Sequence, residues 1–207
     1  ASARNLGVIF DNNLNMKVHI KSVCKSAWYH LRNLFHIRKY LNTSAAEILV
    51  HAFITSRLDQ CNSLYYGLPK CTTDQLQYIQ NSAARLITGT RKFDHITPIL
   101  KNLHWLPVLY RIKFKIIIMT FKALHCTAPR YICDLVNTKT SARQLRSSKK
   151  NLLDIPRTKN VTCGDCSFQV AAPRLWNKLP EKLKLENNLD KFKTGVKTLL
   201  FIEAYGC

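Results

Sequence analysis

Two cysteines separated by two residues are the clearest material for metal or redox chemistry in this chain. Cys163-Gly164-Asp165-Cys166 has the C-x-x-C spacing of half a zinc site or of a thiol redox pair. A structural zinc ion takes four ligands, and the others would have to come from His125, Cys126 and Cys133, whose spacing is irregular for a zinc finger. We therefore predict no metal site and expect a turn with two incidental thiols, although Cys163 and Cys166 are the residues a zinc ion would use.

The acidic residues show no pattern typical of a catalytic carboxylate cluster. The twelve Asp and Glu residues are scattered, and no two of them are adjacent. Two-metal phosphoryl transfer needs carboxylates that hold paired ions, and no such cluster is visible. Gly-rich phosphate loops, Gly-x-Ser-x-Gly elbows and His-Glu-x-x-His motifs are also absent from the sequence. We expect no catalytic residues, and we predict that the chain alone is inactive as an enzyme.

Positive charge is the dominant property of the composition. Thirty-two Lys and Arg stand against twelve Asp and Glu, which gives a formal net charge of +20. A field of this size attracts polyanions, so nucleic acid is the first partner to consider. Proteins that associate with ribosomes or membrane surfaces, and some that are merely soluble, share this composition.

The chain has the composition of a folded protein. Hydrophobic residues make up 46% of it and only six residues are glycine, so a sizeable core in one large or two small domains is expected. The longest apolar run, 116–121, lies between Lys115 and Lys122 and is far shorter than the roughly 20 residues that cross a bilayer. Eight scattered cysteines favour reduced thiols in an intracellular protein. The first residue is not Met, and we expect a fragment or an incomplete gene product.

Hydrophobic periodicity predicts several amphipathic helices before residue 137. A strand is expected over 4–10, followed by a turn at Asp11, which we interpret as a turn residue and not a metal ligand. Ser44 and Glu47 form a capping-box pattern that would begin the second helix, and Thr72 begins the cap pattern of the third. The helices are predicted over 16–41, 44–64, 72–88, 98–103 and 108–124.

The composition changes after residue 137. Residues 139–159 are rich in Lys, Arg, Ser and Thr and read as a solvated basic linker. Strands are expected over 152–155 and 167–170, a short helix over 172–177 and a terminal helix over 189–201. The predicted fold is therefore mainly α, an antiparallel helical bundle with a short N-terminal strand and a small mixed α/β C-terminal module. Its parts are 1–14 (strand and turn), 15–137 (helical domain), 138–160 (basic linker) and 161–207 (C-terminal module).

Several motifs in order resemble one family. They are LGVIFD at 6–11, QNSAARLITG at 80–89, HWLP at 104–107 with Arg111 and Ile112 after it, LRSS at 145–148, LDIPRT at 153–158 and AAPRLWNKLP at 171–180. This series resembles the C-terminal part of reverse transcriptases of non-LTR retrotransposons of the LINE type, closest to the jockey and chicken-repeat branches. The resemblance covers nearly the whole chain, from the end of the palm through the thumb and the region after it. The catalytic aromatic-Ala-Asp-Asp turn of that family is not in this sequence.

The resemblance implies a nucleic-acid-binding portion of an RNA-directed DNA polymerase. RNA template, DNA or an RNA–DNA hybrid would be its partners, together with the palm and fingers domains, and Mg²⁺ would belong to the absent catalytic domain. The expected compartments are the nucleus and the cytoplasm, and no membrane partner is expected. The thumb of the family grips duplex behind the active site, which makes the basic residues of the helices and linker phosphate candidates: Arg32, Arg38, Lys39, Arg85, Arg111, Arg143, Arg146, Lys149, Lys150, Arg157 and Lys159.

Other interpretations of the same residues stay open. Arg32, Arg38 and Lys39 fit a solvated helix face, Arg85 and Arg111 fit caps of a helix face, and the 143–159 patch fits a solvated linker. Trp105 is expected to be a packed anchor beneath a helix start and not a base-stacking platform. The alternative to nucleic-acid binding is a helical protein-interaction or scaffold domain, or the inert remnant of a decayed element.

Overall fold

The computed structural model describes residues 2–139, 151–159 and 163–206, and these residues are mainly helical with a small N-terminal sheet. This confirms the predicted fold class. The chain divides into two compact units, Ala1–Arg111 and Ile112–Cys207. The sequence placed its main boundary after residue 137, whereas the units meet inside a helix.

The N-terminus forms a β-hairpin where the sequence predicted one strand. Strands β1 (Ser2–Asn5) and β2 (Val8–Asp11) pair antiparallel, with Asn5 opposite Val8. The turn between them has positive φ at both central residues, 47° at Leu6 and 85° at Gly7. Two such residues in succession make the tight turn that matches strand twist, and glycine meets this demand without strain. Gly7 is thus a turn residue and not a strand residue.

The first unit continues with three helical passages. The first is α1 (Lys17–Ile37) with the 3₁₀ turn η1 (Arg38–Tyr40). The second comprises α2 (Thr43–Val50), the π-helical η2 (His51–Thr55), α3 (Ser56–Asp59) and the 3₁₀ turn η3 (Asn62–Tyr65). The third is α4 (Lys70–Thr88). These correspond to the three long helices expected from periodicity.

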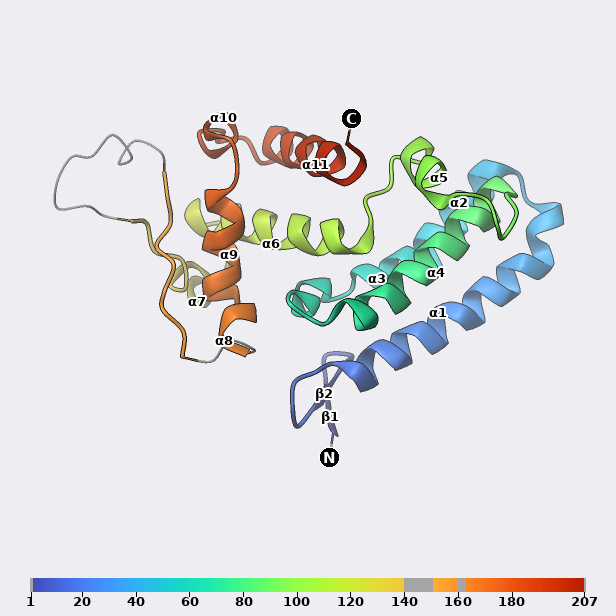
Figure 1. The fold of residues 1–207 in the computed structure, drawn as a ribbon, viewed down its shortest axis with the longest axis horizontal. Coiled ribbons are helices and arrows are strands. Elements are labelled where there is room, and N and C mark those ends of the chain that lie inside the picture. Colours follow the sequence, from blue (N-terminus) through green and yellow to red (C-terminus); the bar gives the residue numbers. More distant parts are fainter. Residues whose placement is uncertain (1, 140–150, 160–162, 207) are drawn as a thin grey trace. The chain divides into compact units, whose positions relative to one another are not determined.

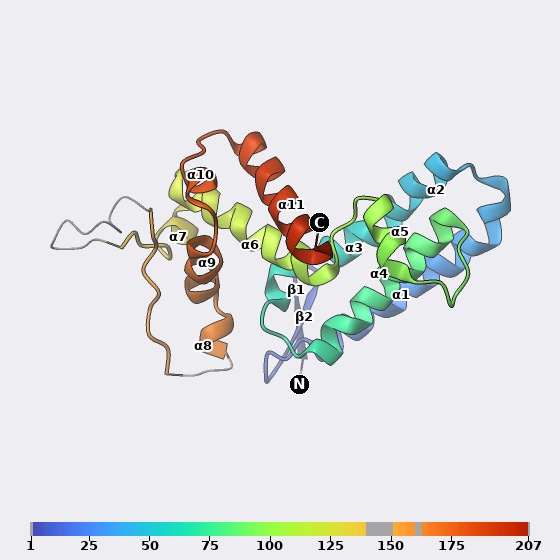
Figure 2. The same ribbon diagram turned by 45° about the horizontal axis from the view of Figure 1, so that its top comes forward.

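The three passages run up, down and up. The His30 ring stacks on Phe53, with centroids 5.3 Å apart, and the His19 ring lies 6.0 Å from that of Tyr65, so the second passage is antiparallel to α1. Trp28 contacts Tyr78, and Arg38 reaches Leu86, so α4 is parallel to α1. Helices α1 and α4 lie side by side in both ribbon views (Figures 1 and 2).

Aliphatic side chains from the inward faces of these helices form the core of the first unit. Ile20, Leu31, Ile54, Leu76 and Ile79 are completely buried. Their burial is the main force that holds the passages together, since each large aliphatic side chain contributes about 1.5–3 kcal/mol when removed from water. The charged residues of α1 are consequently left on its outer side.

Two caps differ from those predicted. The first residue of α2 is Thr43, and its cap is Asn42, whose side-chain oxygen accepts a hydrogen bond from the Ala45 N–H at 2.7 Å. Ser44 lies inside the helix, and Glu47 contacts His51 at 3.6 Å. α4 begins at Lys70 with Pro69 before it, upstream of the predicted cap. An Asn at the N-cap supplies the acceptor that the Ser was expected to provide.

The end of α4 and the start of the next helices follow the prediction closely. Gly89 closes α4 with φ of 69°, and its N–H donates to the Arg85 carbonyl. α5 (Ile96–Asn102) follows, and α6 (Val108–Leu124) has the predicted bounds. Trp105 is buried before α6 and packs on the His51 ring at 5.4 Å. The expectation of a packed anchor at Trp105 is confirmed.

The second unit is helical in all its described regular elements except one isolated bridge. Besides the later part of α6 it contains α7 (Arg130–Cys133), α8 (Cys163–Cys166), α9 (Phe168–Asn177), α10 (Glu181–Lys184) and α11 (Leu189–Tyr205). The strand predicted over 167–170 is wrong, because those residues cap and begin α9. The helices predicted over 172–177 and 189–201 are confirmed as parts of α9 and α11.

Three aromatic rings from three helices form the centre of the second unit. Phe121 of α6 stacks on Phe192 of α11 at 4.3 Å, and Trp176 of α9 lies 5.7 Å from Phe192. The Trp176 indole N–H donates to the Asn151 carbonyl at 3.0 Å, which satisfies its polar end. The motif at 171–180 therefore contributes to the core of this unit.

The segment predicted as a solvated linker is anchored at both of its described ends. Thr138 and Leu153 form a β-bridge, and the side chain of Asn177 exchanges two 2.9 Å hydrogen bonds with the backbone of Leu153. Composition marks residues 139–159 as polar, but it does not report the β-bridge to Thr138 or the hydrogen bonds to the Asn177 side chain of α9, which are tertiary contacts. Residues 140–150 lie outside the described part of the chain.

Candidate nucleic-acid interface

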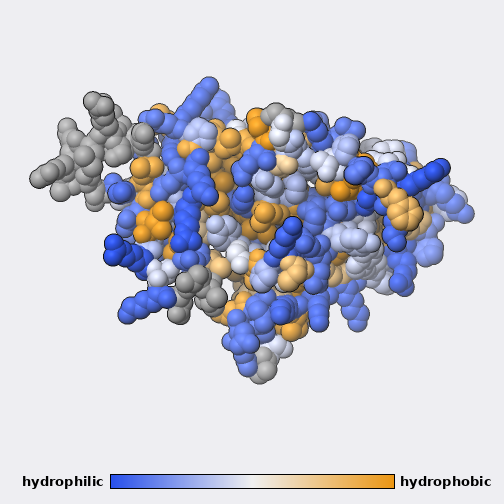
Figure 3. Space-filling view, viewed as in Figure 1, coloured by the Kyte–Doolittle hydropathy of each residue, from blue (hydrophilic) through white to orange (hydrophobic). Residues whose placement is uncertain are grey.

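The outer side of α1 carries a row of exposed cations. Lys17, Lys21, Lys25 and Arg32 are all exposed, and at 3.6 residues per turn they fall within an arc of about 80°. Ile20 and Leu31 are buried on the adjoining side, roughly 100° around the helix from the centre of that arc, and fix the orientation of the helix. We call these four residues the α1 basic face. Hydrophilic side chains with scattered hydrophobic ones cover the region of α1 in the space-filling view (Figure 3).

The sequence segment that contains α1 has no acidic residue. Six Lys and Arg residues lie between Asp11 and Glu47 without one Asp or Glu among them. Within the described part of the chain, no ion pair involves a residue of the α1 basic face. Residues 178–206 also hold six Lys and Arg, but four acids lie among them. The sequence segment that contains α1 is thus the more uniformly positive of the two.

Exposed aromatic side chains accompany the cations on the same side of α1. Trp28 is 39% exposed and Phe35 is 53% exposed. Together with Arg32 and His36 they line a recess of about 390 Å³, which we call the Trp28 recess. Aromatic rings flanked by cations are the side chains that hold single-stranded nucleic acids, since the rings stack on bases and the cations contact phosphates.

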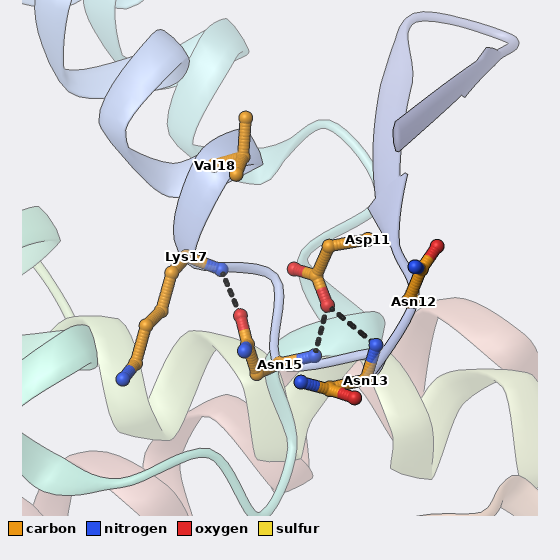
Figure 4. A pocket seen from close by; sticks show the side chains of 6 residues that line it. All are labelled: Asp11, Asn12, Asn13, Asn15, Lys17 and Val18. Atoms are coloured by element: carbon orange, nitrogen blue, oxygen red, sulfur yellow. Dashed lines mark hydrogen bonds between the residues drawn. The ribbon is translucent and has the colours of Figure 1, made fainter. Parts of the chain in front are cut away.

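A network of short polar side chains positions the start of α1 (Figure 4). The Asp11 carboxylate accepts hydrogen bonds from the N–H groups of Asn13, at 3.2 Å, and Asn15, at 2.9 Å. The Asn15 side-chain oxygen accepts from the Lys17 N–H at 3.0 Å and satisfies one donor of the first turn. The predicted role of Asp11 as a turn residue is confirmed, and the Lys17 ammonium extends away from this network.

Two of the predicted phosphate candidates on helices are exposed. Arg32 belongs to the α1 basic face. Lys39 lies in η1, and its ammonium sits 4.8 Å from the centroid of the Tyr40 ring. The guanidinium or ammonium group of each remains accessible to an anion.

Three other candidates make internal contacts. The Arg38 guanidinium donates to the carbonyls of Leu41, Leu86 and Ile87 at 2.7–2.9 Å, which closes the C-terminal end of α4. Arg85 donates to the Asp94 carbonyl at 3.0 Å. Arg111 forms a two-pronged ion pair with Asp59, with Nε 2.8 Å from Oδ1.

The sequence left open whether Arg85 and Arg111 contact phosphates or have a structural role. These contacts favour the structural role. Arg38 also makes internal contacts, which neither the phosphate interpretation nor the solvated-face interpretation predicted. For Arg38 and Arg111, sequence could not show this because the decisive acceptors lie far along the chain. Leu86, for example, is 48 residues from Arg38.

The basic patch at 143–159 is only partly described. Arg143, Arg146, Lys149 and Lys150 lie outside the described residues. Arg157 and Lys159 are exposed.

The C-x-x-C segment forms the short helix α8. Its Asp165 accepts hydrogen bonds from the Thr158 hydroxyl at 2.7 Å and from Arg174 at 3.0 Å. The Thr158 hydrogen bond and the Arg174 charge lower the pKa of this carboxyl group. Cys166 is half-buried. Among the residues that the structure describes, no three His, Cys, Asp or Glu side chains are grouped so as to hold a metal ion.

The other residues that a zinc ion would have needed are His125, Cys126 and Cys133, and two of them make local contacts. His125 Nδ1 lies 2.9 Å from the Phe121 carbonyl, and the Cys133 thiol donates to the Ala128 carbonyl at 3.4 Å. Cys126 is exposed, with a φ of 52°.

Sequence reasoning missed the aromatic part of this surface. The signal was present, since Trp28 and Phe35 share a helical side with Lys21, Lys25 and Arg32, but an apolar residue in an amphipathic helix is usually assigned to the core. Only burial shows that these two rings are on the outside. Tyr78 of α4, also exposed, lies 5.9 Å from Trp28 and supports its other side.

Comparison with models of protein families, with curated proteins and with solved structures found no match. Within the described ranges, no helix is both long and apolar enough to cross a bilayer.

Proposed function

We propose that this chain binds nucleic acid without sequence preference, and that the α1 basic face is the principal contact surface. The observation that carries the proposal is the row of four exposed cations on one side of α1, with no acid in the sequence from residue 12 to residue 46. Such a row can neutralise several phosphates at once and releases their counterions when it binds. Lys39 and the exposed Arg157 and Lys159 are further contacts.

The motif resemblance supports a more specific role. In this proposal the chain is the thumb and post-thumb portion of a LINE-type reverse transcriptase, and it holds RNA template, DNA or RNA–DNA hybrid for the palm and fingers domains. The chemistry and its Mg²⁺ belong to those domains, because this sequence contains no adjacent pair of carboxylates. Its compartments are the nucleus and the cytoplasm.

A protein-binding surface is the second candidate function. Tyr29 and Phe53 are exposed, and both rings contact His30, at 5.4 and 5.3 Å between centroids. An exposed aromatic cluster of this kind fits an interaction or scaffold domain. Salt dependence separates the two candidates, since an apolar contact does not weaken with added salt as a phosphate contact does.

Binding to a labelled RNA–DNA hybrid over a salt series tests the proposal. We expect the logarithm of the association constant to fall linearly with the logarithm of the salt concentration. A variant with Lys21→Gln, Lys25→Gln and Arg32→Gln should lose about 2 to 3 units of that slope, because each lost phosphate contact removes about 0.9.

The matched control removes the same charge elsewhere. Lys182, Lys191 and Lys197 are exposed on α10 and α11, and their replacement with Gln should leave most of the slope intact. Equal slopes for the α1 variant and the unmodified chain would contradict the assignment to α1. Absence of any salt-dependent binding would contradict the proposed function itself and favour the protein-binding candidate.

A further inference from the structure

The Trp28 recess has the chemistry of a base-binding site. Among the described residues, two aromatic side chains, one guanidinium and one imidazole line it, and no acid does. Its volume of about 390 Å³ falls in the range of small-molecule sites. Its aromatic surfaces can stack on the face of any base, whereas the guanidinium can contact a phosphate or stack in its turn.

The neighbouring recess on the other side of Trp28 is a poorer site for a nucleotide. It is lined by Asp74, Cys71 and Tyr78 among others, and none of its described lining residues is a cation. The Asp74 carboxylate repels phosphate, so charge favours the Trp28 recess. The Tyr78 ring instead packs against the indole, with the two ring centroids 5.9 Å apart.

We propose that the Trp28 recess holds one unpaired base of a single-stranded nucleic acid, with its flanking phosphates on Arg32 and the lysines of the α1 basic face. This inference rests on the proposed function and names its ligand. In a duplex the faces of the bases are stacked on one another and are not available to a protein ring. A single strand can turn one base outward into the recess.

The length of the surface suits several nucleotides. From Lys17 to His36 the helix advances about 29 Å, at 1.5 Å per residue. The stacked base lies toward the C-terminal part of this path, and Lys21 and Lys25 extend it toward the N-terminus.

Intrinsic fluorescence provides a direct readout of stacking. The chain has three tryptophans, at 28, 105 and 176. Trp105 is 6% exposed and Trp176 is 2% exposed, so a base that stacks on an indole from solvent can reach Trp28 alone. We expect oligothymidylate and oligouridylate to quench the fluorescence, and an abasic strand of equal length and charge to leave it unchanged. Oligodeoxyuridylate differs from oligouridylate only in the sugar, so unequal affinity for those two strands would distinguish DNA from RNA as the ligand.

Affinity provides the second readout, with the full chain and the same oligonucleotides. Trp28→Ala should weaken binding of the base-bearing strands by about 5- to 150-fold at every salt concentration, which is the effect of one lost stacking contact. The salt slope should not change, since no phosphate contact is removed. Trp28→Phe should retain most of the affinity, and binding of the hybrid duplex should be unaffected by either change.

Two results would overturn the inference. One is equal affinity of the unmodified chain for the abasic and base-bearing strands, which requires no variant and so does not depend on how Trp28→Ala folds. The other is unchanged affinity of a Trp28→Ala chain with native helical content by circular dichroism. If hybrid binding keeps its salt slope in these cases, only the recess assignment fails; if no polyanion binds at all, the proposed function fails as well.

Discussion

Replacement of Arg38 with alanine should destabilise the first unit without weakening nucleic-acid binding. The Arg38 guanidinium donates three hydrogen bonds of 2.7–2.9 Å to backbone carbonyls, and two of these, at Leu86 and Ile87, belong to the last turn of α4. Carbonyls in a last helical turn have no partner within the helix, and a cation at that end is also favoured by the helix dipole.

The magnitude follows from these contacts. A hydrogen bond from a charged donor contributes about 1.5–3 kcal/mol, but Arg38 is only half-buried and water can reach part of the vacated site, so we expect a net loss of about 2–4 kcal/mol. For a chain of this size that corresponds to a decrease in Tm of roughly 5–15 °C.

Thermal unfolding by circular dichroism, with hybrid binding over a salt series in parallel, tests this prediction. Arg38→Lys is the matched control, since it keeps the charge but cannot span three carbonyls, and it should lose part of the stability. A Tm within about 1 °C of the unmodified protein, together with a salt slope lower by about 1, would refute the reasoning and identify Arg38 as a phosphate contact.

Two further predictions concern the first unit. Asn42→Ala should lower the free energy of unfolding by about 1 kcal/mol through loss of the α2 cap, whereas Ser44→Ala should lower it little. Urea denaturation measures both changes. A larger loss for Ser44→Ala than for Asn42→Ala would support the capping box at Ser44 instead. Burial lowers the pKa of His19 from its ordinary value of 6.5, so this side chain binds a proton more readily in the unfolded chain than in the folded one. The stability that neutral His19 contributes should therefore be fully present above pH 6.5 and decline as the pH falls below it. His19→Gln should flatten the decline in Tm between neutral pH and about pH 5, and an unchanged profile would contradict this role of His19.

Local pattern was sufficient for most of the helices. α6 has the predicted bounds, and the helical stop at Gly89 is the predicted one, because a helix of this length carries many periodic positions and Gly adopts positive φ without strain. Short elements were less well predicted. The turn at Leu6 and Gly7 was read as strand because it lies between two short runs of β-forming residues.

The candidate site was also only partly predictable from the sequence. Net charge and the acid-free region around α1 are properties of composition, so the sequence alone identifies a basic protein with a basic helix. Which of its arginines face solvent is decided by partners distant in the chain: Arg38 meets the end of α4, Arg111 meets Asp59, and Arg32 meets no described acid.

Burial likewise separates tryptophans that look alike in sequence. Trp105 and Trp176 pack into their units, while Trp28 has an exposed face beside Arg32. Periodicity places an apolar residue on a helix side, but only the packing of the other helices decides whether that side is covered. The helices and the distribution of charge can therefore be predicted from local sequence in this chain. Whether each arginine or indole lies in the core or on the surface depends on contacts between distant segments.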